Sequence, residues 1–415
     1  MDKMELEEGD PENHAFSFMS ERKDRNKRNC WLTYTNEKTH EIIRENIMRA
    51  PKYAGKIHGI GARYCPSIED KVVRFADKDR HQLFVEPEEL DTTEMYVQGM
   101  STSMPIDVQY AFLRTIPGFE DVKMMRPAYA IEYDLLDPLQ LYPTLEVIKL
   151  PGLYSAGQSN GTSGYEEAAA QGLVAGINAA LKIQGKDPFI LARHEAYIGS
   201  LVDDLVTKGA DEPYRMMTSR SEYRLILRQD NADLRLTEKG HSIGLVGEER
   251  YARFLERKKK YEEAMDYIRT QRFTPKEEIN RALESMGTAP LTTGTGADQI
   301  LKRPEMTYRK MMETLGCPSF DEEAVEEMEI TVKYEGYIAR QEAAVRKAAR
   351  MENEKLPLDM DYLSLDGIST EARQKMDKIR PLSLGQAARI PGVSPADISV
   401  LMVYVKQRKG KKGAE

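Results

Sequence analysis

The sequence predicts a mixed α/β region followed by an all-α region. Short β-prone segments bounded by Gly, Pro, Asn and Asp residues fill the first part of the chain, and they lead into one strand–turn–helix unit at Gly152–Gly176. From Asp187 onward, apolar residues recur at the three- and four-residue intervals of amphipathic helices. We therefore expect the α/β fold class, with a second part built only of helices.

Length and composition indicate a soluble protein of two to four domains. The chain has 415 residues, of which 40% are hydrophobic and 31% charged, and a net charge of -8. No apolar run approaches the roughly 20 residues that span a bilayer, so no membrane association is expected. The acidic N-terminus lacks the apolar core of a signal peptide. Three widely spaced cysteines favour a reducing, cytoplasmic location over a disulfide framework, and no structural metal is expected.

Several secondary-structure elements can be predicted in the first part of the chain. Each expected strand is a short β-prone run between turn residues, and each expected helix has apolar residues on one face. The expected strands are Trp31–Tyr34, Val72–Phe75, Gln82–Val85, Arg126–Tyr133, Thr144–Lys149 and Leu153–Ala156, and the expected helices are Thr39–Met48 and Ile106–Arg114.

The second part of the chain is expected to be helical throughout. Pro188 suits the first position of a helix that ends at Gly209, and Ser394 suits the cap of the last helix. Between them, the expected helices cover Phe189–Lys208, the arginine-rich stretch near Arg220, Gly247–Arg272 and Asp321–Lys355. In the last of these, Gly336 costs about 1 kcal/mol of stability unless something packs closely against it.

The stretch Gly152–Gly176 is the centre of the predicted site. Ser163 and Glu166 have the spacing of a capping box, which would start the helix after a polar turn. We expect one apolar helix face, with two glycines that allow close packing on a sheet; these residues are Ala169, Gly172, Leu173, Gly176, Ile177, Ala180 and Leu181. A capped helix N-terminus behind a polar loop suits a phosphate or an electron-rich ring. An ordinary strand-to-helix turn remains the alternative.

A second candidate is the glycine-rich segment Gly59–Phe75. It places Cys65 near Arg63 and Lys71, whose charges would lower the pKa of the thiol and make it a nucleophile or an acid. A cysteine buried in a core is the alternative. The Gly59-Ile60-Gly61 sequence alone is too weak to predict a dinucleotide loop.

Arginines are concentrated in the stretch 215–235. Arg220, Arg224 and Arg228 recur every four residues and would form one stripe on a helix, with Tyr223 beside them for stacking on a base. A locally basic face can bind a polyanion even on an acidic protein. A solvated helix face is the alternative.

Eight long motifs resemble the MnmG (GidA) family of tRNA uridine 5-carboxymethylaminomethyl modification enzymes. They occur in one order and the likeness runs from about residue 10 to about residue 409. The motifs are RYCPSIEDK at Arg63–Lys71, HQLFVEPE at His81–Glu88, STSMP at Ser101–Pro105, RPAYAIEYD at Arg126–Asp134, AGQSNGTSGYEEAAAQG at Ala156–Gly172, SRSEYRLILRQDNADLRLT at Ser219–Thr237, KYEGYIARQ at Lys333–Gln341 and RPLSLGQAARIPGVSPADIS at Arg380–Ser399.

This resemblance implies a cytoplasmic flavoprotein that modifies the wobble uridine of tRNA together with the GTPase MnmE. In the family, FAD mediates the redox steps, NADH reduces it, and methylene-tetrahydrofolate supplies the one-carbon unit. The product carries a carboxymethylaminomethyl or aminomethyl group at C5 of the uridine. A homodimer, and a heterotetramer with MnmE, are the implied assemblies.

The resemblance also implies roles for particular residues. Cys65 would be the catalytic cysteine, and the arginine-rich stretch and the C-terminal helices would serve tRNA and MnmE. The implied FAD contacts are Gln158, Asn160, Gly161, Thr162 and Gly164. The implied tRNA contacts are Arg220, Arg224, Arg228, Arg235, Lys333 and Arg340. The implied NAD segment is Gly61, Ala62, Arg63, Tyr64, Cys65, Pro66, Ser67, Ile68, Glu69, Asp70, Lys71, Val72, Val73, Arg74 and Phe75.

The fold that the resemblance implies is a Rossmann-like FAD/NAD(P)-binding domain with a mixed β insertion, followed by an all-α domain. The expected parts are 1–95 (insertion with the NAD segment), 96–186 (FAD-binding), 187–330 (helical, facing tRNA) and 331–415 (helical, docking MnmE or tRNA). No GxGxxG motif lies between a strand and a helix, so we expect a truncated FAD domain. Smaller departures from the family are Ala62 and Ser159.

Two other functions stay open at this point. The chain would act as a flavin-free module that only binds tRNA and MnmE if FAD needs the missing motif. A folate- and FAD-dependent tRNA uridine methyltransferase has a similar Gly-Gln loop, but it lacks the long helical extension found here.

Overall fold

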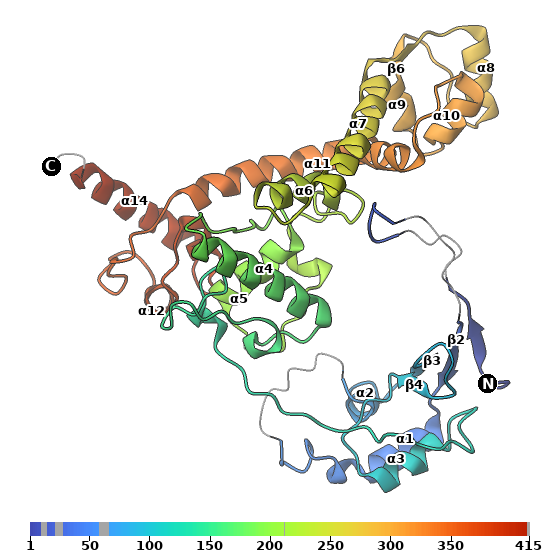
Figure 1. The fold of residues 1–415 in the computed structure, drawn as a ribbon, viewed down its shortest axis with the longest axis vertical. Coiled ribbons are helices and arrows are strands. Elements are labelled where there is room, and N and C mark those ends of the chain that lie inside the picture. The colour runs from blue at the N-terminus through green and yellow to red at the C-terminus, as the bar shows by residue number, and fades with distance from the viewer. Residues whose placement is uncertain (10–14, 21–27, 58–65, 211, 413–415) are drawn as a thin grey trace. The chain divides into compact units, whose positions relative to one another are not determined.

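The chain forms two compact units in the computed structural model (Figure 1). The structure describes residues 1–9, 15–20, 28–57, 66–210 and 212–412. The first unit comprises Met1–Pro138, Ser155–Gly172 and Ala210–Arg215, and the second comprises Leu139–Tyr154, Leu173–Gly209 and Met216–Glu415.

The first unit is built on a four-stranded antiparallel sheet. Its strands, in the order in which they pair, are β1 (Glu5–Glu7), β2 (Cys30–Tyr34), β3 (Gln82–Pro87) and β4 (Met95–Gln98). In the register, Leu32 lies opposite Phe84 and Val85 opposite Val97. Alternate residues of β3, Leu83 and Val85, are buried, which is the period of a strand with one face on a core.

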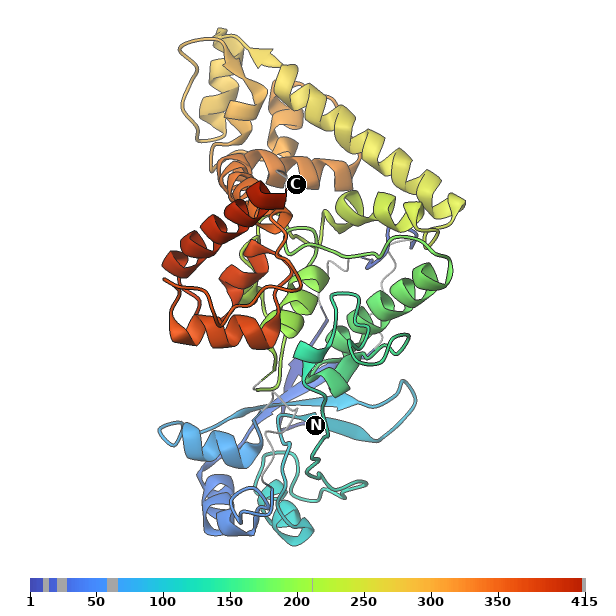
Figure 2. The same ribbon diagram turned by 90° about the vertical axis from the view of Figure 1, so that its left-hand side faces the viewer.

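Three helices share the core of this sheet: α1 (Glu37–Glu45), α2 (Ile68–Arg74) and α3 (Ile106–Leu113). A short 3-10 helix, η1 (Ile47–Arg49), follows α1. Asn36 starts α1 with a capping box that it forms with Thr39, and its side-chain amide also donates to the Thr115 carbonyl oxygen at 2.6 Å. The strands and helices of this unit are visible together in Figure 2.

The remaining part of the chain is mainly helical. After α3 the chain forms the 3-10 helices η2 (Pro138–Gln140) and η3 (Gly157–Asn160) and then helix α4 (Tyr165–Ile183), whose residues up to Gly172 belong to the first unit and the rest to the second. The later elements are α5 (Tyr197–Lys208), η4 (Thr218–Arg220), α6 (Ala232–Ser242), α7 (Glu248–Thr270), β5 (Arg272–Phe273), α8 (Glu277–Ser285), β6 (Thr295–Gly296), α9 (Ala297–Leu301), α10 (Tyr308–Leu315), α11 (Glu322–Asn353), α12 (Thr370–Ile379), α13 (Leu384–Arg389) and α14 (Pro395–Lys412).

Helix α11 connects two separate cores of the second unit. Figure 1 shows it running from the cluster of α7 to α10 to the cluster of α12 to α14. Met328 and Val332 on its first turns belong to the core that Ile268 and Tyr308 fill, whereas Leu384, Leu401 and Val405 belong to the C-terminal core. With 32 residues, α11 is about 48 Å long. The expected mixed α/β part and the helical C-terminal part are therefore confirmed.

Most predicted helices are confirmed, with shifted ends. The expected helices at residues 39–48, 106–114, 247–272 and 321–355 correspond to α1, α3, α7 and α11, and the helix expected after Ser394 is α14. The helix expected over Phe189–Lys208 begins only at Tyr197, although it ends at Gly209 as expected, where φ is 75°. The arginine stripe is wrong, because the chain after η4 turns repeatedly before α6 begins at Ala232.

Four predicted strands are wrong. Val72–Phe75 lies in and just after α2, because Ser67 caps a helix there and Val72 packs on its core side. Arg126–Tyr133 is irregular, and Thr144–Lys149 and Leu153–Ala156 form only isolated bridges between Leu141 and Val147 and between Glu146 and Tyr154. A strand is stabilised by pairing with a neighbouring strand. Among the described residues, these segments pair with other segments only through single bridges.

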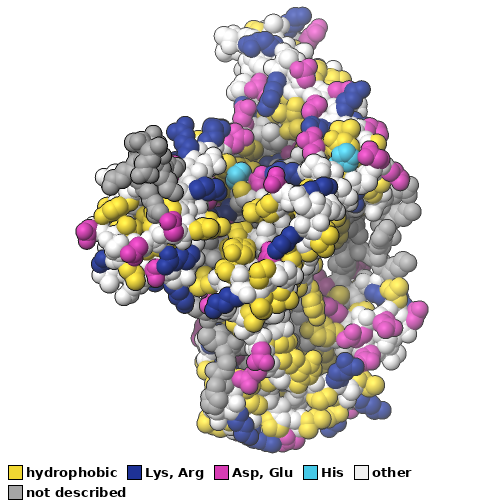
Figure 3. Space-filling model, turned by 60° about the vertical axis from the view of Figure 1, so that its left-hand side comes forward, with side chains coloured by type: hydrophobic (Ala, Val, Ile, Leu, Met, Phe, Trp, Pro, Cys, Tyr) yellow, Lys and Arg dark blue, Asp and Glu magenta, His cyan; other side chains and the backbone are white. Residues whose placement is uncertain are grey.

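Hydrophobic side chains are exposed in several places, some of them visible in Figure 3. Met125, Tyr129, Ile131 and Tyr133 are exposed along the irregular segment that was expected to be a strand. In the described part of the chain, no helix is long and apolar enough to cross a membrane. The expected domain boundaries after residues 95, 186 and 330 stay predictions; α11 continues across the last of them.

A buried carboxylate ties α11 to the loop before α6. Glu327 accepts a hydrogen bond from Arg228 at 2.6 Å, while Arg228 also pairs with Asp230 at 3.0 Å. One guanidinium therefore serves two carboxylates. Burial raises the pKa of Glu327, and a side-chain hydrogen bond with Asp230 raises it further. Together these two effects outweigh the charge of Arg228, which lowers the pKa.

The raised pKa of Glu327 predicts that stability falls as pH rises. The folded state holds this proton at a pH where the unfolded carboxyl, with its ordinary pKa of 4.5, has lost it. Above pH 4.5, the favourable contribution of the proton is lost until the folded carboxyl also ionises. Glu327→Gln still accepts a hydrogen bond from Arg228 but cannot ionise, so its stability should depend less on pH. The measurement is the free energy of unfolding in urea between about pH 5 and 8, the interval between the ordinary and the raised pKa of Glu327. Identical pH profiles of the two proteins would contradict the assignment.

Candidate functional site

The loop after Tyr154 folds into a tight polar turn within the first unit. The 3-10 helix η3 occupies Gly157–Asn160; its first residue, Gly157, and the glycine that follows it, Gly161, have positive φ, 84° and 81°. A side chain is disfavoured in this region of backbone conformation. At Gly161, a Cβ would also come within 2.7 Å of the Ala210 Cβ, so the loop depends on glycine there for two reasons.

A buried amide network holds this turn. Asn160 is fully buried; its Nδ2 donates to the Ser155 carbonyl oxygen at 2.9 Å and to Gln171 Oε1 at 2.8 Å. The Ser155 hydroxyl donates to Asn160 Oδ1 at 2.6 Å. Gln171, also fully buried on α4, accepts from the Gly157 amide at 3.2 Å and donates to Thr162 Oγ1 at 3.0 Å. Every donor and acceptor of the two amides is therefore used to fix the loop on the helix.

The chain around Tyr214 closes the other side of the loop. The Tyr214 amide donates to the Gly161 carbonyl oxygen at 2.8 Å, and the Ser163 amide donates to the Tyr214 carbonyl oxygen at 3.0 Å, as in a short parallel bridge. The Ser163 hydroxyl also donates to that carbonyl oxygen, at 3.3 Å. The predicted Ser163 cap is thus wrong, because α4 begins at Tyr165 and the hydroxyl is used outside the helix.

The predicted FAD contacts divide into buried and accessible groups. Asn160 and Thr162 are buried and bonded within the loop, whereas Gln158 and Gly164 are partly exposed. Gln158 is therefore the predicted contact whose side chain is available at the surface of the turn. Sequence reasoning missed Gln171, Ser155 and Tyr214; the signal for Gln171 is a polar residue one turn after Glu167 on the same helix face.

The charge at the start of α4 is negative. Glu166 and Glu167 lie in its first turn, and Arg215 approaches both carboxylates at 3.8 Å. These carboxylates already complement the positive end of the helix dipole. A phosphate at this end would meet their charge, so of the two ligands that the sequence suggested, a phosphate or an electron-rich ring, the ring fits the site better.

The buried face of α4 differs from the predicted one. The buried residues are Glu167, Gln171, Val174, Ala175, Asn178 and Leu181, of which only Leu181 was expected. Polar side chains are buried because the loop and the chain at Phe189 provide partners; Asn178, for example, bonds with the Phe189 backbone in both directions at 2.8 and 3.0 Å. Leu173 is 46% exposed, and among the residues that the structure describes nothing lies within 4 Å of a Cβ built on Gly172 or Gly176.

Only part of the predicted NAD segment can be placed. Gly61, Ala62, Arg63, Tyr64 and Cys65 lie outside the described residues. Pro66 and Ser67 are partly exposed, and Ser67 accepts from the Asp70 amide as the cap of α2. Within α2 and directly after it, the members that face inward are Ile68, Glu69, Asp70 and Val72, those that face outward are Val73, Arg74 and Phe75, and Lys71 is partly buried.

Two buried carboxylates hold the beginning of α2 in place. Glu69 Oε1 accepts from the Ser103 amide at 2.9 Å and from its hydroxyl at 2.8 Å, which fixes the loop before α3. Asp70 binds Lys52 at 2.8 Å and the Tyr53 hydroxyl at 3.0 Å. Burial acts to raise the pKa of Asp70, but the bonds from Lys52 and Tyr53 outweigh it and lower this pKa. These side chains therefore support the segment rather than line a cleft.

The predicted tRNA residues separate into internal and surface groups. Arg228 is held by Asp230 and Glu327, and Arg235 donates to Asn231 at 2.8 Å and to the carbonyl oxygens of Arg228 and Glu195. These two arginines stabilise the fold.

The other predicted tRNA residues come together through Gln341. Its side chain accepts from the Leu225 amide at 3.2 Å and donates to the Glu222 carbonyl oxygen at 3.3 Å. The segment that carries exposed Arg224 is thereby fixed beside Arg340 on α11, with Lys333 two turns earlier on the helix. Arg220 lies at the end of η4, just before this segment.

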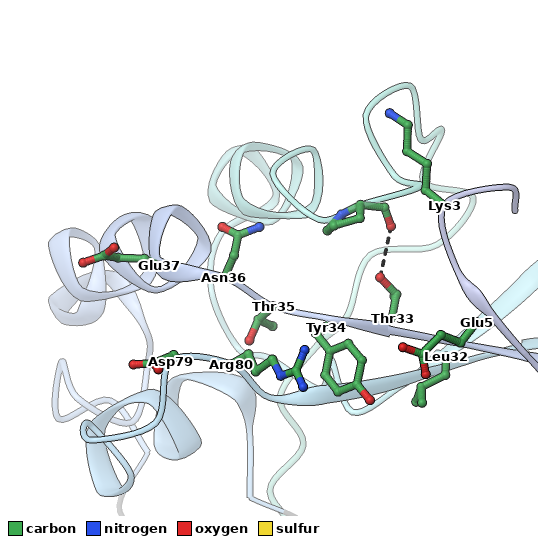
Figure 4. A pocket seen from close by; sticks show the side chains of 11 residues that line it. Lys3, Glu5, Leu32, Thr33, Tyr34, Thr35, Asn36, Glu37, Asp79 and Arg80 are labelled. Atoms are coloured by element: carbon green, nitrogen blue, oxygen red, sulfur yellow. Dashed lines mark hydrogen bonds between the residues drawn. The ribbon is translucent and has the colours of Figure 1, made fainter.

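Each unit contains a pocket. In the first unit, a cavity of about 380 Å³ lies at the end of β2, where Arg80 covers the Tyr34 ring at 4.1 Å and the Thr33 hydroxyl donates to the Pro117 carbonyl oxygen (Figure 4). In the second unit, a cavity of about 350 Å³ has an apolar wall with Val174 and Val202 and a polar wall with His194. Across the described ranges, no cluster of His, Cys, Asp or Glu side chains could hold a metal ion.

The chain matches family models along most of its length. Residues 1–187 match the model described as glucose inhibited division protein A, residues 248–342 the MnmG/GidA C-terminal helical domain, and residues 344–415 the MnmG/GidA C-terminal helical bundle. These matches define a protein class with a GidA-type first part followed by two helical C-terminal domains.

Curated relatives and solved structures agree with the family models. The chain is 55% identical over 412 residues to a tRNA uridine 5-carboxymethylaminomethyl modification enzyme MnmG of Caldicellulosiruptor saccharolyticus, and 56% identical over 411 residues to that of Clostridium kluyveri. These alignments cover 99% of this chain but 66% and 65% of the relatives, so the chain spans about two thirds of their length.

A solved structure of Aquifex aeolicus GidA superimposes with a TM-score of 0.85 at 44% identity, covering 97% of this chain and 64% of that one. A second crystal form gives a TM-score of 0.84 at 46% identity, with coverage of 97% and 65%. The chain belongs to the MnmG (GidA) family.

Two glycines test the geometry of the loop. Gly161→Ala should destabilise the protein through both the left-handed backbone, at about 1–2 kcal/mol, and the contact with Ala210. Gly185→Ala is the matched control, because φ is 67° there and nothing lies within 4 Å of the added Cβ. The measurement is the free energy of unfolding in urea. Equal losses for the two variants would show that the Ala210 contact does not constrain the loop.

Proposed function

We propose that the chain takes part in FAD-dependent modification of tRNA. The reaction would add a carboxymethylaminomethyl or aminomethyl group to C5 of the wobble uridine, together with the GTPase MnmE. Identity of 54–56% to relatives named for this modification, over nearly the whole chain, supports the proposal. A homodimer, a heterotetramer with MnmE formed through residues 331–415, and a cytoplasmic location are parts of the same proposal.

The observation that carries the proposal is the Gly157–Gly161 turn. The amides of Asn160 and Gln171 are used within the protein to hold the turn in shape, and Gln158 on it is partly exposed. Preorganised polar groups of this kind lower the cost of binding. The two acidic residues at the start of α4 favour the flavin ring over the pyrophosphate as the group held here.

Each of the chain's own groups has a defined task in this proposal. The Gln158 amide would hydrogen-bond the edge of the flavin ring, and the backbone from Gly161 to Gly164 would border it. Bound FAD would supply the electron transfer, and NADH would reduce it. Methylene-tetrahydrofolate would donate the one-carbon unit. Cys65 would act as nucleophile or acid toward the uridine, with residues 61–75 serving NAD. Arg220, Arg224, Lys333 and Arg340 would bind tRNA phosphates.

Flavin binding by this chain tests the role of Gln158. Gln158→Ala should weaken FAD binding by about 5- to 10-fold, the effect of one lost hydrogen bond, because the rest of the turn does not depend on this side chain. Gln184→Ala, an exposed glutamine just after α4, is the matched control. The measurement is quenching of flavin fluorescence on titration. Equal affinities for wild type and Gln158→Ala would exclude the contact.

The catalytic role proposed for Cys65 can be tested by replacing its thiol with a hydroxyl. With FAD, NADH, methylene-tetrahydrofolate, glycine or ammonium, and MnmE present, Cys65→Ser should lower tRNA modification by at least about 100-fold, because a hydroxyl is a far weaker nucleophile and acid than a thiol. Nucleoside composition of the tRNA gives the readout, and Cys30→Ser is the control. Undiminished modification by Cys65→Ser would refute a catalytic role.

A second candidate is a flavin-free module that binds tRNA and MnmE. The exposed face of α4 is the observation that favours it: Leu173 is 46% exposed, and among the described residues nothing lies within 4 Å of a Cβ built on Gly172 or Gly176. Salt-dependent tRNA binding by a colourless protein that FAD does not titrate would support this function over the first. A folate- and FAD-dependent tRNA uridine methyltransferase is disfavoured by the C-terminal helical matches.

A further inference from the structure

The middle of α11 exposes two tyrosines side by side. Tyr334 and Tyr337 are 46% and 59% exposed, and their ring centroids are 6.5 Å apart with the planes inclined by 50°. They lie three residues apart and so share one side of the helix. Tyrosine rings offer flat surfaces on which bases stack, and a pair in this position is open to solvent.

Between the tyrosines lies a glycine that the fold does not need. Gly336 has helical backbone in the middle of a 32-residue helix, where glycine lowers stability relative to alanine. Among the described residues, nothing lies within 4 Å of a Cβ built on Gly336, so packing within the described protein would tolerate a side chain there. What the glycine does provide is backbone open to close approach by a flat group from outside.

Cations lie on both sides of this glycine. Lys333 and Arg340 are seven residues apart and therefore lie on one line along the helix, about 10 Å from each other. The Arg340 guanidinium lies 5.8 Å from the Tyr337 ring centroid, in the geometry of a cation–π contact. Lys333 shares its charge with Glu329, at 2.6 Å, and Glu335 pairs with Lys302 at 2.6 Å.

The bond network of Gln341 extends this surface. Because Gln341, the residue after Arg340, bonds to the backbone of both Glu222 and Leu225, the segment that carries the exposed Arg224 is held against α11. Flat aromatic rings, open backbone and flanking cations together match the chemistry of unpaired nucleotides, whose bases stack while their phosphates pair. A helical peptide would instead need a continuous apolar stripe, and Arg340 and Glu342 interrupt one here.

We propose that the strip formed by Lys333, Tyr334, Gly336, Tyr337 and Arg340 binds unpaired nucleotides of RNA by stacking bases on the two tyrosines. The inference rests on the proposed function in that tRNA supplies the RNA, and it adds that the strip contacts a loop or an unpaired end rather than a paired stem. The lysine and the arginines position the strand through its phosphates and carry no sequence information.

The test compares two labelled RNAs on the full chain by fluorescence anisotropy: a hairpin with an unpaired loop and a blunt duplex of the same length. Wild type should prefer the hairpin. Tyr334→Ala with Tyr337→Ala should weaken hairpin binding by about 10- to 100-fold, given the usual contribution of base stacking, and leave duplex binding unchanged. Tyr334→Phe with Tyr337→Phe keeps the rings and should bind as wild type does.

Gly336→Ala is the most discriminating variant. It should raise the stability of the helix, because alanine is the better helix former, and at the same time weaken hairpin binding. Weaker binding by a more stable protein cannot be explained by unfolding. Arg340→Ala should weaken binding of both RNAs and reduce the dependence of affinity on salt.

The outcomes separate this inference from the proposed function. If wild type binds the hairpin and both the tyrosine-to-alanine pair and Gly336→Ala bind it equally well, the strip is not the site, although tRNA binding elsewhere stands. If wild type binds hairpin and duplex equally, stacking of unpaired bases is overturned. If wild type binds neither RNA at low salt, both the inference and the tRNA part of the proposed function fail.

Discussion

The side-chain amide of Gln171 is the interaction on which the candidate flavin loop depends. It accepts from the Gly157 amide and from Asn160 and donates to Thr162, so one residue of α4 fixes both ends of the turn. Removal of this amide would leave buried donors without partners, which costs about 1–3 kcal/mol for each group. A loop held in this way keeps Gln158 in place at its surface without help from a ligand. The rigidity of the site therefore comes from residues that no ligand needs to touch.

A comparable constraint acts at one end of the second unit. Arg193 is buried and binds Asp204 at 2.7 Å, Asp203 at 3.1 Å and Glu222 at 2.9 Å, while Arg389 binds Asp203 at 2.8 Å. These bonds link α5, the arginine-rich segment and α13. Buried ion pairs add little net stability, because removal of the charges from water offsets their attraction, but they disfavour any other arrangement of the same helices. Their effect is to orient the C-terminal helices against α5 and to hold the backbone of Glu222, which Gln341 then ties to α11.

Helices of this protein could be predicted from the sequence, whereas most of its strands could not. The apolar stripe of α7 or α11 repeats within a few residues, so its signal is local. A strand takes its stability from a neighbour that can lie far away in the sequence, and Thr144–Lys149 finds only single bridging partners. The same reason explains the site. The glycines of the turn were predictable because they act on their own backbone, but the role of Gln171 depends on partners up to 14 residues earlier in the chain. The face of α4 was assigned wrongly because buried polar partners outweighed its apolar periodicity.

Glycines show how the structure turns a sequence feature into a functional argument. Gly161 is explained inside the protein, by a φ of 81° and by the Ala210 Cβ against which any side chain would press. Gly336 satisfies neither condition, since its backbone is helical and the space around it is open. Gly336 lowers the stability of a long helix and serves no packing contact within the described protein, so its open backbone is free for the group that we propose to bind there. The exposed tyrosines on either side indicate that this is a flat, stacking group.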